Sequence, residues 1–587
     1  MNRISSLKGW LSRPIALTVA VLAAGLQLLA SPAFAGYELP PGERITNLPP
    51  IPRAIPQKEA YENYDPVIGR NFDVKNLWLR ADLRVRPEWR NGVCFGGGAP
   101  SGGACNTFGG NTTSTGRNVG ATRANSGPNA SDFYVQQWAR LGIGYDLSPD
   151  VNFYMEIIDS ATWGGNGSPN NAGNAGDPLN HNCGASAANS QANCRLGVRA
   201  AYMLVRNLGD IQGLSMKVGR QYIIFGNHSL FGHFDWANTG YSHDGVMFQY
   251  STKNFDSYLG WFRNSETDIA QATPVGSAGA NIGGCGVAGT ASTPGTACSA
   301  AQRTATGRDG SADADMFIFY NQIKSVPGFL IEPYYILYIN NMSVYDNLAQ
   351  GTGTAKHANQ IRHNFGNRTE MRKGNWDIIN EIDWQTGRMA SGLQGQSRDL
   401  TINAWATRNW VGYTDYNSKW KPRYAIGLDY ASGDGNANCT TNGTSVAAPG
   451  QACKTANTFE NFFPTNHIHM GYMDIQGWKN MMSPQFNYQA RPSERDHIEI
   501  WYSHLRLANA KDNWYRGSQG VYVWSRTDNT KTHIGDEVDF TWTRMFADGK
   551  VAFQTTYSHM WAGDYIAQNL GQGGGQDWAY AQLWMNF

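Results

Sequence analysis

The sequence predicts an all-β fold, a transmembrane antiparallel β-barrel of about eighteen strands with short periplasmic turns and long external loops. The first observation is the end of the chain, residues 577–587, where Ala, Leu, Met and Phe alternate with Tyr, Gln, Trp and Asn. The second is residues 77–90, where apolar and charged side chains alternate. This period of two is expected where one face of a strand meets lipid and the other meets water.

The composition agrees with this fold class. Charged residues make up 16% of the 587 residues, below the roughly 25% typical of soluble domains. The mean hydropathy of −0.45 is polar, and a barrel allows this because half of each strand faces water. The net charge of +1 argues against a protein that binds nucleic acid.

The N-terminus predicts export. Residues 1–35 read as a Sec signal peptide, with a basic start, an apolar run over 15–30 and the cleavage pattern Ala33-Phe34-Ala35. Residues 36–70 are rich in proline and read as a periplasmic lead-in, which leaves room for a periplasmic partner. Residues 71–587 then form the barrel, so the expected location is the outer membrane of a Gram-negative cell, with the lipid bilayer as partner.

Eighteen segments carry the strand pattern. They are residues 77–90, 132–147, 150–161, 195–207, 214–223, 243–251, 255–266, 313–324, 328–341, 357–371, 375–386, 397–412, 419–432, 480–491, 496–508, 533–545, 550–561 and 577–587. If the first begins in the periplasm, the periplasmic connections are short and the external ones long, as in bacterial barrels. Aromatic residues near strand ends are expected to form the interfacial girdles, among them Trp89, Tyr145, Trp410 and Trp561.

Eight cysteines fall in the external connections, in four close pairs. The simplest pairing joins Cys94 to Cys105, Cys183 to Cys194, Cys285 to Cys298 and Cys439 to Cys453, although sequence alone does not fix connectivity. An exported chain passes through an oxidising compartment, so these loops are expected to carry disulfides. The wide spacings, without any Cys-x-x-Cys, disfavour a metal site.

Alternation along the strands places a set of charged side chains in the lumen, where they would line the pore and set its selectivity. They are Arg80, Asp82, Arg84, Arg86, Arg140, Arg195, Arg199, Lys217, Arg362, Arg368, Glu381, Asp383, Arg423, Glu537 and Asp539. A sugar acid would use arginine contacts of this kind. The alternative is that the charges pair across strands and hold the barrel in shape. Arg80, Arg84 and Arg86 are close together along the strand, and Asp82 is the only carboxylate among them. One carboxylate cannot pair with three arginines, so at least one arginine should remain free to face a solute.

Three stretches resemble signatures of the alginate-export family of outer-membrane porins. They read KVGRQYIIFGNHSLFGHFDWANTGYSHDGVMFQY from Lys217, FENFFPTNHIHMGYMD over 459–474, and GDEVDFTWTRMFADGKVAFQTTYSHMWAGDYI over 535–566. The resemblance implies an eighteen-stranded monomeric barrel with an arginine-rich constriction that passes an anionic polysaccharide outward. This chain departs from the pattern in its long loops with cysteines and in its many inward carboxylates.

Two of these stretches fall in external loops that are able to fold inward. Residues that would line or narrow the mouth are Phe231, His233, Phe234, Asp235 and Trp236. His467 and His469 form a His-x-His pair, but no third ligand stands at a recognisable spacing, so a polar packing role is the better interpretation.

We therefore expect a porin for the passive passage of small polar or anionic solutes, such as sugar acids. The alternatives are an exporter of an anionic polysaccharide resembling alginate and a barrel that sheathes an electron-transfer protein. The sequence has no Cys-x-x-Cys-His for a haem of its own. Ser503-His504 and Ser558-His559 place serine and histidine on opposite faces of a strand, which disfavours a hydrolase. No catalytic residue, cofactor or metal is expected.

Overall fold

The chain is seen in a computed structural model that describes residues 74–92, 132–163, 196–237, 240–265, 314–340, 360–390, 399–435, 455–515, 517, 521–523, 529–570 and 573–586. The signal peptide, the proline-rich lead-in and all eight cysteines lie outside the described residues. Among the described residues, no helix has the length and the apolar character needed to cross a membrane.

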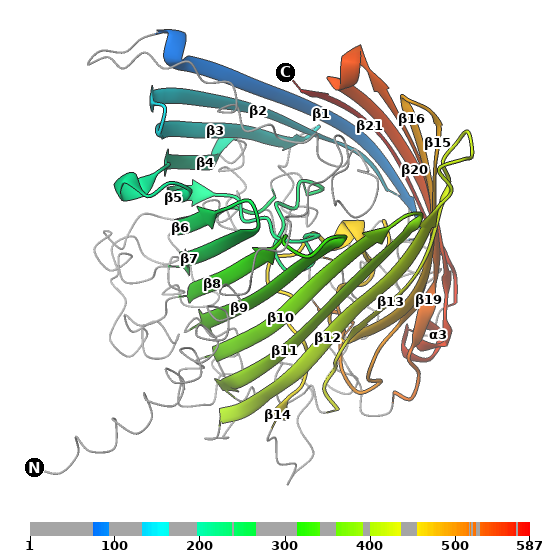
Figure 1. Ribbon diagram of the computed structural model, residues 1–587. Coiled ribbons are helices and arrows are strands. Elements are labelled where there is room, and N and C mark those ends of the chain that lie inside the picture. Colours follow the sequence, from blue (N-terminus) through cyan, green and yellow to red (C-terminus); the bar gives the residue numbers. More distant parts are fainter. Residues whose placement is uncertain are drawn as a thin grey trace, which may run out of the picture.

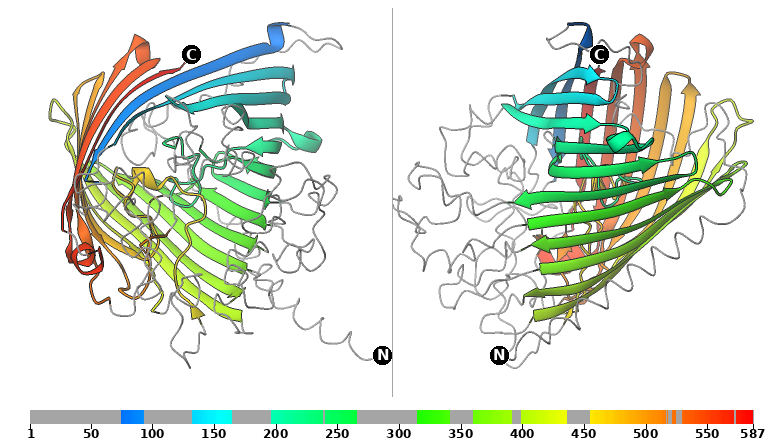
Figure 2. Two further views of the ribbon diagram at one scale, coloured as in Figure 1. Left: turned by 180° about the vertical axis from the view of Figure 1, so that it is seen from behind. Right: turned by 60° about the vertical axis from the view of Figure 1, so that its left-hand side comes forward.

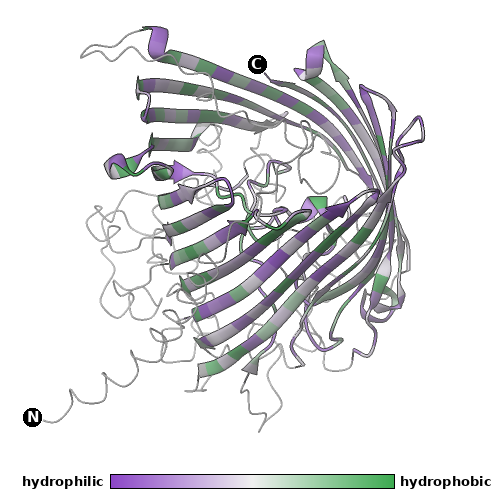
Figure 3. Cartoon of the chain, viewed as in Figure 1, coloured by the Kyte–Doolittle hydropathy of each residue, from purple (hydrophilic) through white to green (hydrophobic). Residues whose placement is uncertain are grey.

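Alternation of side chains shapes the first strand, β1 (Leu77–Asn91). Arg84 and Arg86 are buried on its inner face, whereas Leu79 on the outer face is 62% exposed. The same alternation of polar and apolar residues runs along the other strands as bands of opposite hydropathy (Figure 3). Because the outer face carries the exposed apolar side chains, it is the face that lipid solvates.

One sheet contains nineteen of the described strands, and all but the short β14 (Thr455–Ala456) form the barrel wall. The other wall strands are β2 (Asp132–Ser148), β3 (Val151–Thr162), β4 (Leu196–Val205), β5 (Leu214–Gln221), β6 (His243–Ser251), β7 (Phe255–Ser265), β8 (Ala314–Ile323), β9 (Phe329–Asn340), β10 (Gln360–Lys373), β11 (Trp376–Ala390), β12 (Asp399–Thr414), β13 (Arg423–Ala431), β15 (Met481–Ser493), β16 (Asp496–Arg506), β19 (His533–Phe546), β20 (Val551–Ala562) and β21 (Gln576–Asn586). Each pairs antiparallel with its neighbours, and Figures 1 and 2 show them around one ring.

The barrel closes where the last strand pairs with the first. In that pair, Arg84 of β1 lies opposite Trp584 of β21, and Trp89 lies opposite Ala579. Closure satisfies the backbone hydrogen bonds of both edge strands, which an open sheet could not do in lipid. The predicted transmembrane barrel of about eighteen strands is thus confirmed, including the strand predicted over 480–491.

The connections differ in length at the two ends of the barrel, as predicted. One end has short turns, such as those over 149–150, 252–254 and 374–375. The connections at the other end are longer, among them the one over 563–575, which contains the helix α3 (Asp564–Leu570). We take the end with short turns as the periplasmic end.

Some smaller features were not predicted. They are α3, β14, the hairpin of β17 (Trp514–Tyr515) with β18 (Val521–Val523), and the 3-10 turns η2 (Val74–Asn76), η7 (Leu208–Asp210), η11 (Asn466–Ile468) and η12 (Ala547–Gly549). The girdle role expected for Trp410 is wrong. Its side chain is only 6% exposed and its indole nitrogen donates to Asp429 on the inner face, 3.1 Å away. Trp561, in contrast, is 53% exposed on the outer face.

A close approach of an indole ring explains a glycine on the inner face of β2. A Cβ at Gly144 would lie 1.9 Å from the ring of Trp78, which stacks on Tyr154. We expect Gly144→Ala to destabilise the barrel by about 1–3 kcal/mol, because the ring must move. The temperature at which the folded band is lost in a heat-modifiability gel should fall.

Gly573→Ala is the matched control, since a Cβ at Gly573 meets nothing within 4 Å. An unchanged transition temperature for Gly144→Ala, equal to that of the control, would contradict the close packing of Trp78.

Candidate functional site

Two connections from the external end fold into the barrel instead of away from it. We call residues 222–237 with 240–242 the first inner segment and residues 455–480 the second inner segment. Figure 1 shows them inside the ring of strands, in blue-green and yellow. They join each other through a short parallel bridge between Phe231 and Phe463, and the amide of Phe463 donates to the carbonyl of Leu230 at 3.0 Å. The two inner segments therefore narrow the lumen, and we call the narrowed region the constriction.

Asp235 anchors the first inner segment to one side of the wall. Its carboxylate, 1% exposed, lies 3.2 Å from Arg140 of β2 and 2.8 Å from Arg199 of β4. Arg84 of β1 donates to the backbone carbonyl of Asp235. Burial raises the pKa of Asp235, but the neighbouring His233 and the guanidinium groups of Arg140 and Arg199 outweigh burial and hold the pKa below its usual range. The carboxylate thus stays charged and paired.

Trp236 makes the next contact along the same segment. Arg86 donates to its carbonyl at 2.9 Å, and the guanidinium carbon of Arg86 lies 3.5 Å from the centre of its ring. The other contacts of this ring are aromatic: it stacks on His467 of the second inner segment at 3.7 Å and meets Trp578 and Tyr580 of β21. Cation–π and aromatic contacts therefore join both inner segments to the wall.

Carboxylates anchor the inner segments on the other strands. Ser229 donates to Glu381 of β11 at 2.6 Å. In the second inner segment, the amide of Met473 donates to Glu537 of β19 at 2.9 Å. The adjacent Tyr472 donates through its amide to Asp539 at 3.3 Å and through its hydroxyl to Glu499 at 2.6 Å. Inward carboxylates thus act as acceptors for the inner segments.

Several other charges of the predicted set pair within the wall. Arg140 donates to Asp82 at 2.8 Å as well as to Asp235. The other pairs are Arg368 with Glu332 and Glu370, Arg423 with Asp377, Arg362 with Gln385, and Asp383 with Tyr334 and Asn364. All of these pairs within the wall except Arg368 with Glu370, both on β10, join different strands, as in the alternative raised from the sequence.

Two cations of the predicted set lie near the periplasmic ends of their strands. Arg80 is the fourth residue of β1, and Lys217 is the fourth residue of β5. Lys217 lies over the ring of Tyr202 at 4.4 Å. Arg80 is half-buried, and its Nη2, which is itself buried, has no hydrogen-bond partner among the described residues. Arg195, also predicted for the lumen, lies outside the described residues.

The side chain of Arg199 points into the lumen because of an irregularity in β4, and simple alternation along this strand does not explain its direction. On β4 the inward side chains are Ala200, Tyr202 and Leu204, so alternation would turn Arg199 outward. Residue 199 is left out of the pairing between β3 and β4, where Glu156 faces Ala200 and Ile157 faces Val198. This β-bulge turns the guanidinium inward, where it meets Asp235.

The two histidines of the His-x-His pair have different partners. His467 lies 3.0 Å from Asp474, whereas His469 donates to the carbonyl of Asn227 at 2.6 Å. The predicted mouth residues all fall on the first inner segment. Phe231 packs on Phe462, His233 is buried beside Asp235, and Phe234 stacks on Tyr241.

Inward residues missed from the sequence include Trp138, Glu332 and Arg408. Trp138 lies beneath Arg84 and Arg140, with its ring centre 3.8 and 4.2 Å from their guanidinium carbons. Glu332 is the single charge in β9, and a lone carboxylate in an apolar membrane strand is a signal that could have found it. Arg408 pairs with Asp429 at 3.0 Å.

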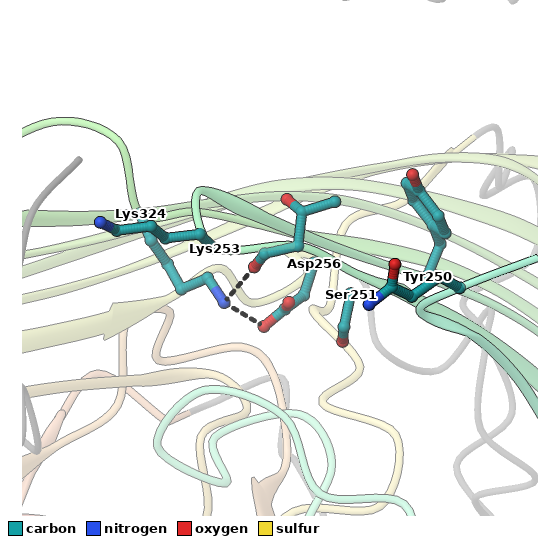
Figure 4. Close-up of a pocket in the computed structure, with 7 residues that line it drawn as sticks. Tyr250, Ser251, Lys253, Asp256 and Lys324 are labelled. Carbon is teal, nitrogen blue, oxygen red and sulfur yellow. Dashed lines mark hydrogen bonds and ion pairs between the residues drawn. The ribbon is translucent and has the colours of Figure 1, made fainter. Parts of the chain in front are cut away.

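A pocket of about 580 Å³ opens at the periplasmic rim, between the turns near β6, β7 and β8. Lys324 donates there to Asp256 at 2.9 Å and to the carbonyl of Thr252 at 3.2 Å (Figure 4). Tyr250, Ser251, Lys253 and Gln212 complete the lining. Because Asp256 neutralises Lys324, the pocket has no strong net charge from that pair.

Comparison with known proteins gives one family. A family model described as alginate export matches residues 292–579, and no curated protein matches the chain. Solved structures similar to it include OpdK of Pseudomonas aeruginosa with vanillate (9% identity, TM-score 0.45, covering 87% of this chain and 98% of OpdK). Another is OccAB1 of Acinetobacter baumannii (10% identity, TM-score 0.44, 87% and 97% covered). Likenesses as distant as these say nothing about what this chain transports.

Proposed function

We propose that this protein, whose residues 292–579 match the family model described as alginate export, is an outer-membrane channel for the passive passage of small polar or anionic solutes. The observation that carries this proposal is the narrowing of the lumen by the two inner segments. Asp235 on one side and Glu381 on another fix the first of them at buried contacts. A lumen narrowed in this way suits a small solute better than a polymer.

The two cations near the periplasmic ends of β1 and β5 support a preference for anions. Arg80 and Lys217 would meet a solute in the periplasmic half of the lumen, because they stand near the start of β1 and β5. Cationic side chains in a narrow wet pore favour anions. Arg84, Arg86, Arg140 and Arg199 are engaged with the first inner segment, so we assign them to holding the constriction. Selectivity then rests mainly on Arg80.

Export of an anionic polysaccharide resembling alginate is the second candidate, and the family match favours it. A polymer would require the inner segments to move out of its path. Addition of uronate oligomers to a planar bilayer separates the two functions, since an exporter should be blocked at low oligomer concentration and a small-solute channel should not.

Arg80→Ser tests the preference for anions. One unit charge at about 4 Å in water is worth about 1 kcal/mol, which corresponds to about a fivefold decrease in the anion-to-cation permeability ratio. Reversal potentials in a salt gradient measure this ratio. Arg220→Ser is the control, because Arg220 pairs with Asp244 on the outer face, where the two side chains are 41% and 55% exposed. Equal ratios for Arg80→Ser and wild type would refute the role of Arg80.

A further inference from the structure

A cluster of two histidines and one aspartate lies on the outer face of the barrel, away from the lumen. His504 is on β16, and His533 and Asp536 are on β19. His504 Nδ1 lies 2.7 Å from Asp536 Oδ1, and His533 Nε2 lies 3.1 Å from Asp536 Oδ2. His504 is near the end of β16, and His533 and Asp536 are near the start of β19. Both of these strand ends are at the external side, so the cluster lies at the outer rim of the wall.

The donor atoms are close enough to share one ion. One ligand atom from each residue lies within 4.8 Å of the others. The imidazole rings of His504 and His533 face each other at 4.5 Å with an angle of 20° between their planes. A tetrahedral zinc ion with Zn–N distances of about 2.0 Å needs ligand atoms about 3.3 Å apart. Small side-chain rotations therefore suffice to bring the three donors around an ion.

The cluster is accessible to an ion from solution. The three side chains are 28% to 32% exposed. Two neutral imidazole nitrogens and a carboxylate oxygen form a ligand set that suits zinc and related divalent transition metals, whereas calcium and magnesium prefer oxygen ligands alone.

A related motif on the neighbouring strands serves as a comparison within the chain. Tyr502-Ser503-His504 recurs as Tyr557-Ser558-His559, and in both motifs the tyrosine and the histidine bond to an aspartate of the next strand. In the second motif that aspartate is Asp577. Among the described residues, only the first motif has a second histidine, His533, on the same carboxylate. One histidine is enough for the hydrogen bonds of the second motif, where His559 contacts Asp577. In the first motif, His533 is an additional histidine that is able to serve as a metal ligand.

We propose that His504, His533 and Asp536 bind one divalent transition-metal ion of the zinc class at the outer rim, with water completing the coordination. The ion would join β16 to β19 where the connection over 507–532 leaves and re-enters the wall. Described residues of that connection cover the second inner segment: Trp514 donates to the carbonyl of Ile475 at 3.0 Å, and Asn480 donates to the carbonyl of Asn513 at 2.9 Å. Metal binding would thus stabilise the base of a connection that contacts the constriction.

Zinc titration of the purified full chain in detergent, in competition with a chromophoric chelator, tests this site. We expect binding of zinc by the wild type and at least about tenfold weaker binding by His533→Ala, since loss of a metal ligand weakens binding more than loss of a residue that only orients a ligand. His559→Ala is the matched control and should bind as the wild type does. A wild-type affinity retained in His533→Ala and in His504→Ala would overturn the proposal.

Thermal unfolding gives a second readout that does not depend on transport. A ligand that binds only the folded state raises the unfolding temperature, so zinc should raise it for the wild type and for His559→Ala. His533→Gln, which keeps a polar side chain at the rim, should show no zinc-dependent rise even if His533→Ala fails to fold. An equal rise in His533→Gln and wild type would refute the site.

Discussion

Replacing Asp235 with alanine is expected to raise the single-channel conductance and to make the current unsteady, while the barrel stays folded. The variant removes the carboxylate that ties Arg140 and Arg199 to the inner segment, so Arg199 loses its ion pair and Arg140 keeps only its pairing within the wall, with Asp82 and Glu156. Removal of one partner from a buried ion pair costs about 3–5 kcal/mol. The loss destabilises the inward position of the first inner segment relative to a displaced position. The barrel itself is not destabilised, because the hydrogen bonds between wall strands do not involve Asp235. Even about 3 kcal/mol changes the ratio of inward to displaced segment more than a hundredfold.

Planar-bilayer recording measures the conductance, and a heat-modifiability gel reports the folded barrel. Asp244→Asn is the matched control, because it breaks an ion pair with Arg220 that is exposed on the outer face. The control should conduct as the wild type does. A folded Asp235→Ala barrel with wild-type conductance would show that the first inner segment does not limit the current.

Trp478→Ala is expected to release the second inner segment in the same way. The indole of Trp478 is fully buried, donates to the carbonyl of Tyr430 at 2.9 Å and packs on Phe459. It belongs to a cluster with Ala404 and Ala406 on the inner face of β12. Truncation of a buried tryptophan to alanine costs about 3–5 kcal/mol. Limited proteolysis should then cleave within residues 455–480, whereas this segment should resist cleavage in the wild type because most of its residues are buried.

Trp384→Ala controls for the loss of a large aromatic side chain, because Trp384 is 48% exposed on the outer face. The double variant Asp235→Ala, Trp478→Ala gives a further check. Since Phe231 and Phe463 join the two inner segments, the two conductance changes should not be additive in free energy. Strict additivity would mean that the segments move independently.

The strand pattern was predictable to a large extent because it is a local property. Each of the eighteen predicted segments overlaps a strand of the barrel wall, and most boundaries differ by a few residues. The two largest shifts are of equal size. One is at the end of β11, predicted at 386 and found at Ala390. The other is at the start of β13, predicted at 419 and found at Arg423, because residues 415–422 form a turn in which Lys421 adopts a positive φ of 43°. Alternation also turned Asp82 and Arg84 inward and Leu79 outward, as the burial of these residues shows.

Strand β12 shows where alternation misleads. Its inner face carries Leu400, Ile402, Ala404 and Ala406, all fully buried, and its outer face carries polar residues such as Asn409. A prediction from polarity alone would therefore assign the inner and outer faces of this strand the wrong way round. The reason is that the second inner segment packs on the inner face, so apolar side chains are favoured there, while Asn409 on the outer face pairs with Asn380 at 2.6 Å.

The sequence by itself determined the barrel, because a period of two along each strand sorts side chains between two solvents and needs no knowledge of distant residues. Only the tertiary structure decided what fills the lumen and which charges it pairs. Asp235 meets Arg140 across 95 positions of the chain, and its carbonyl meets Arg84 across 151. The His504, His533 and Asp536 cluster likewise exists only because β16 and β19 are neighbours in the wall. Local patterns record which solvent a side chain faces, whereas the partner it finds there depends on how the whole chain closes.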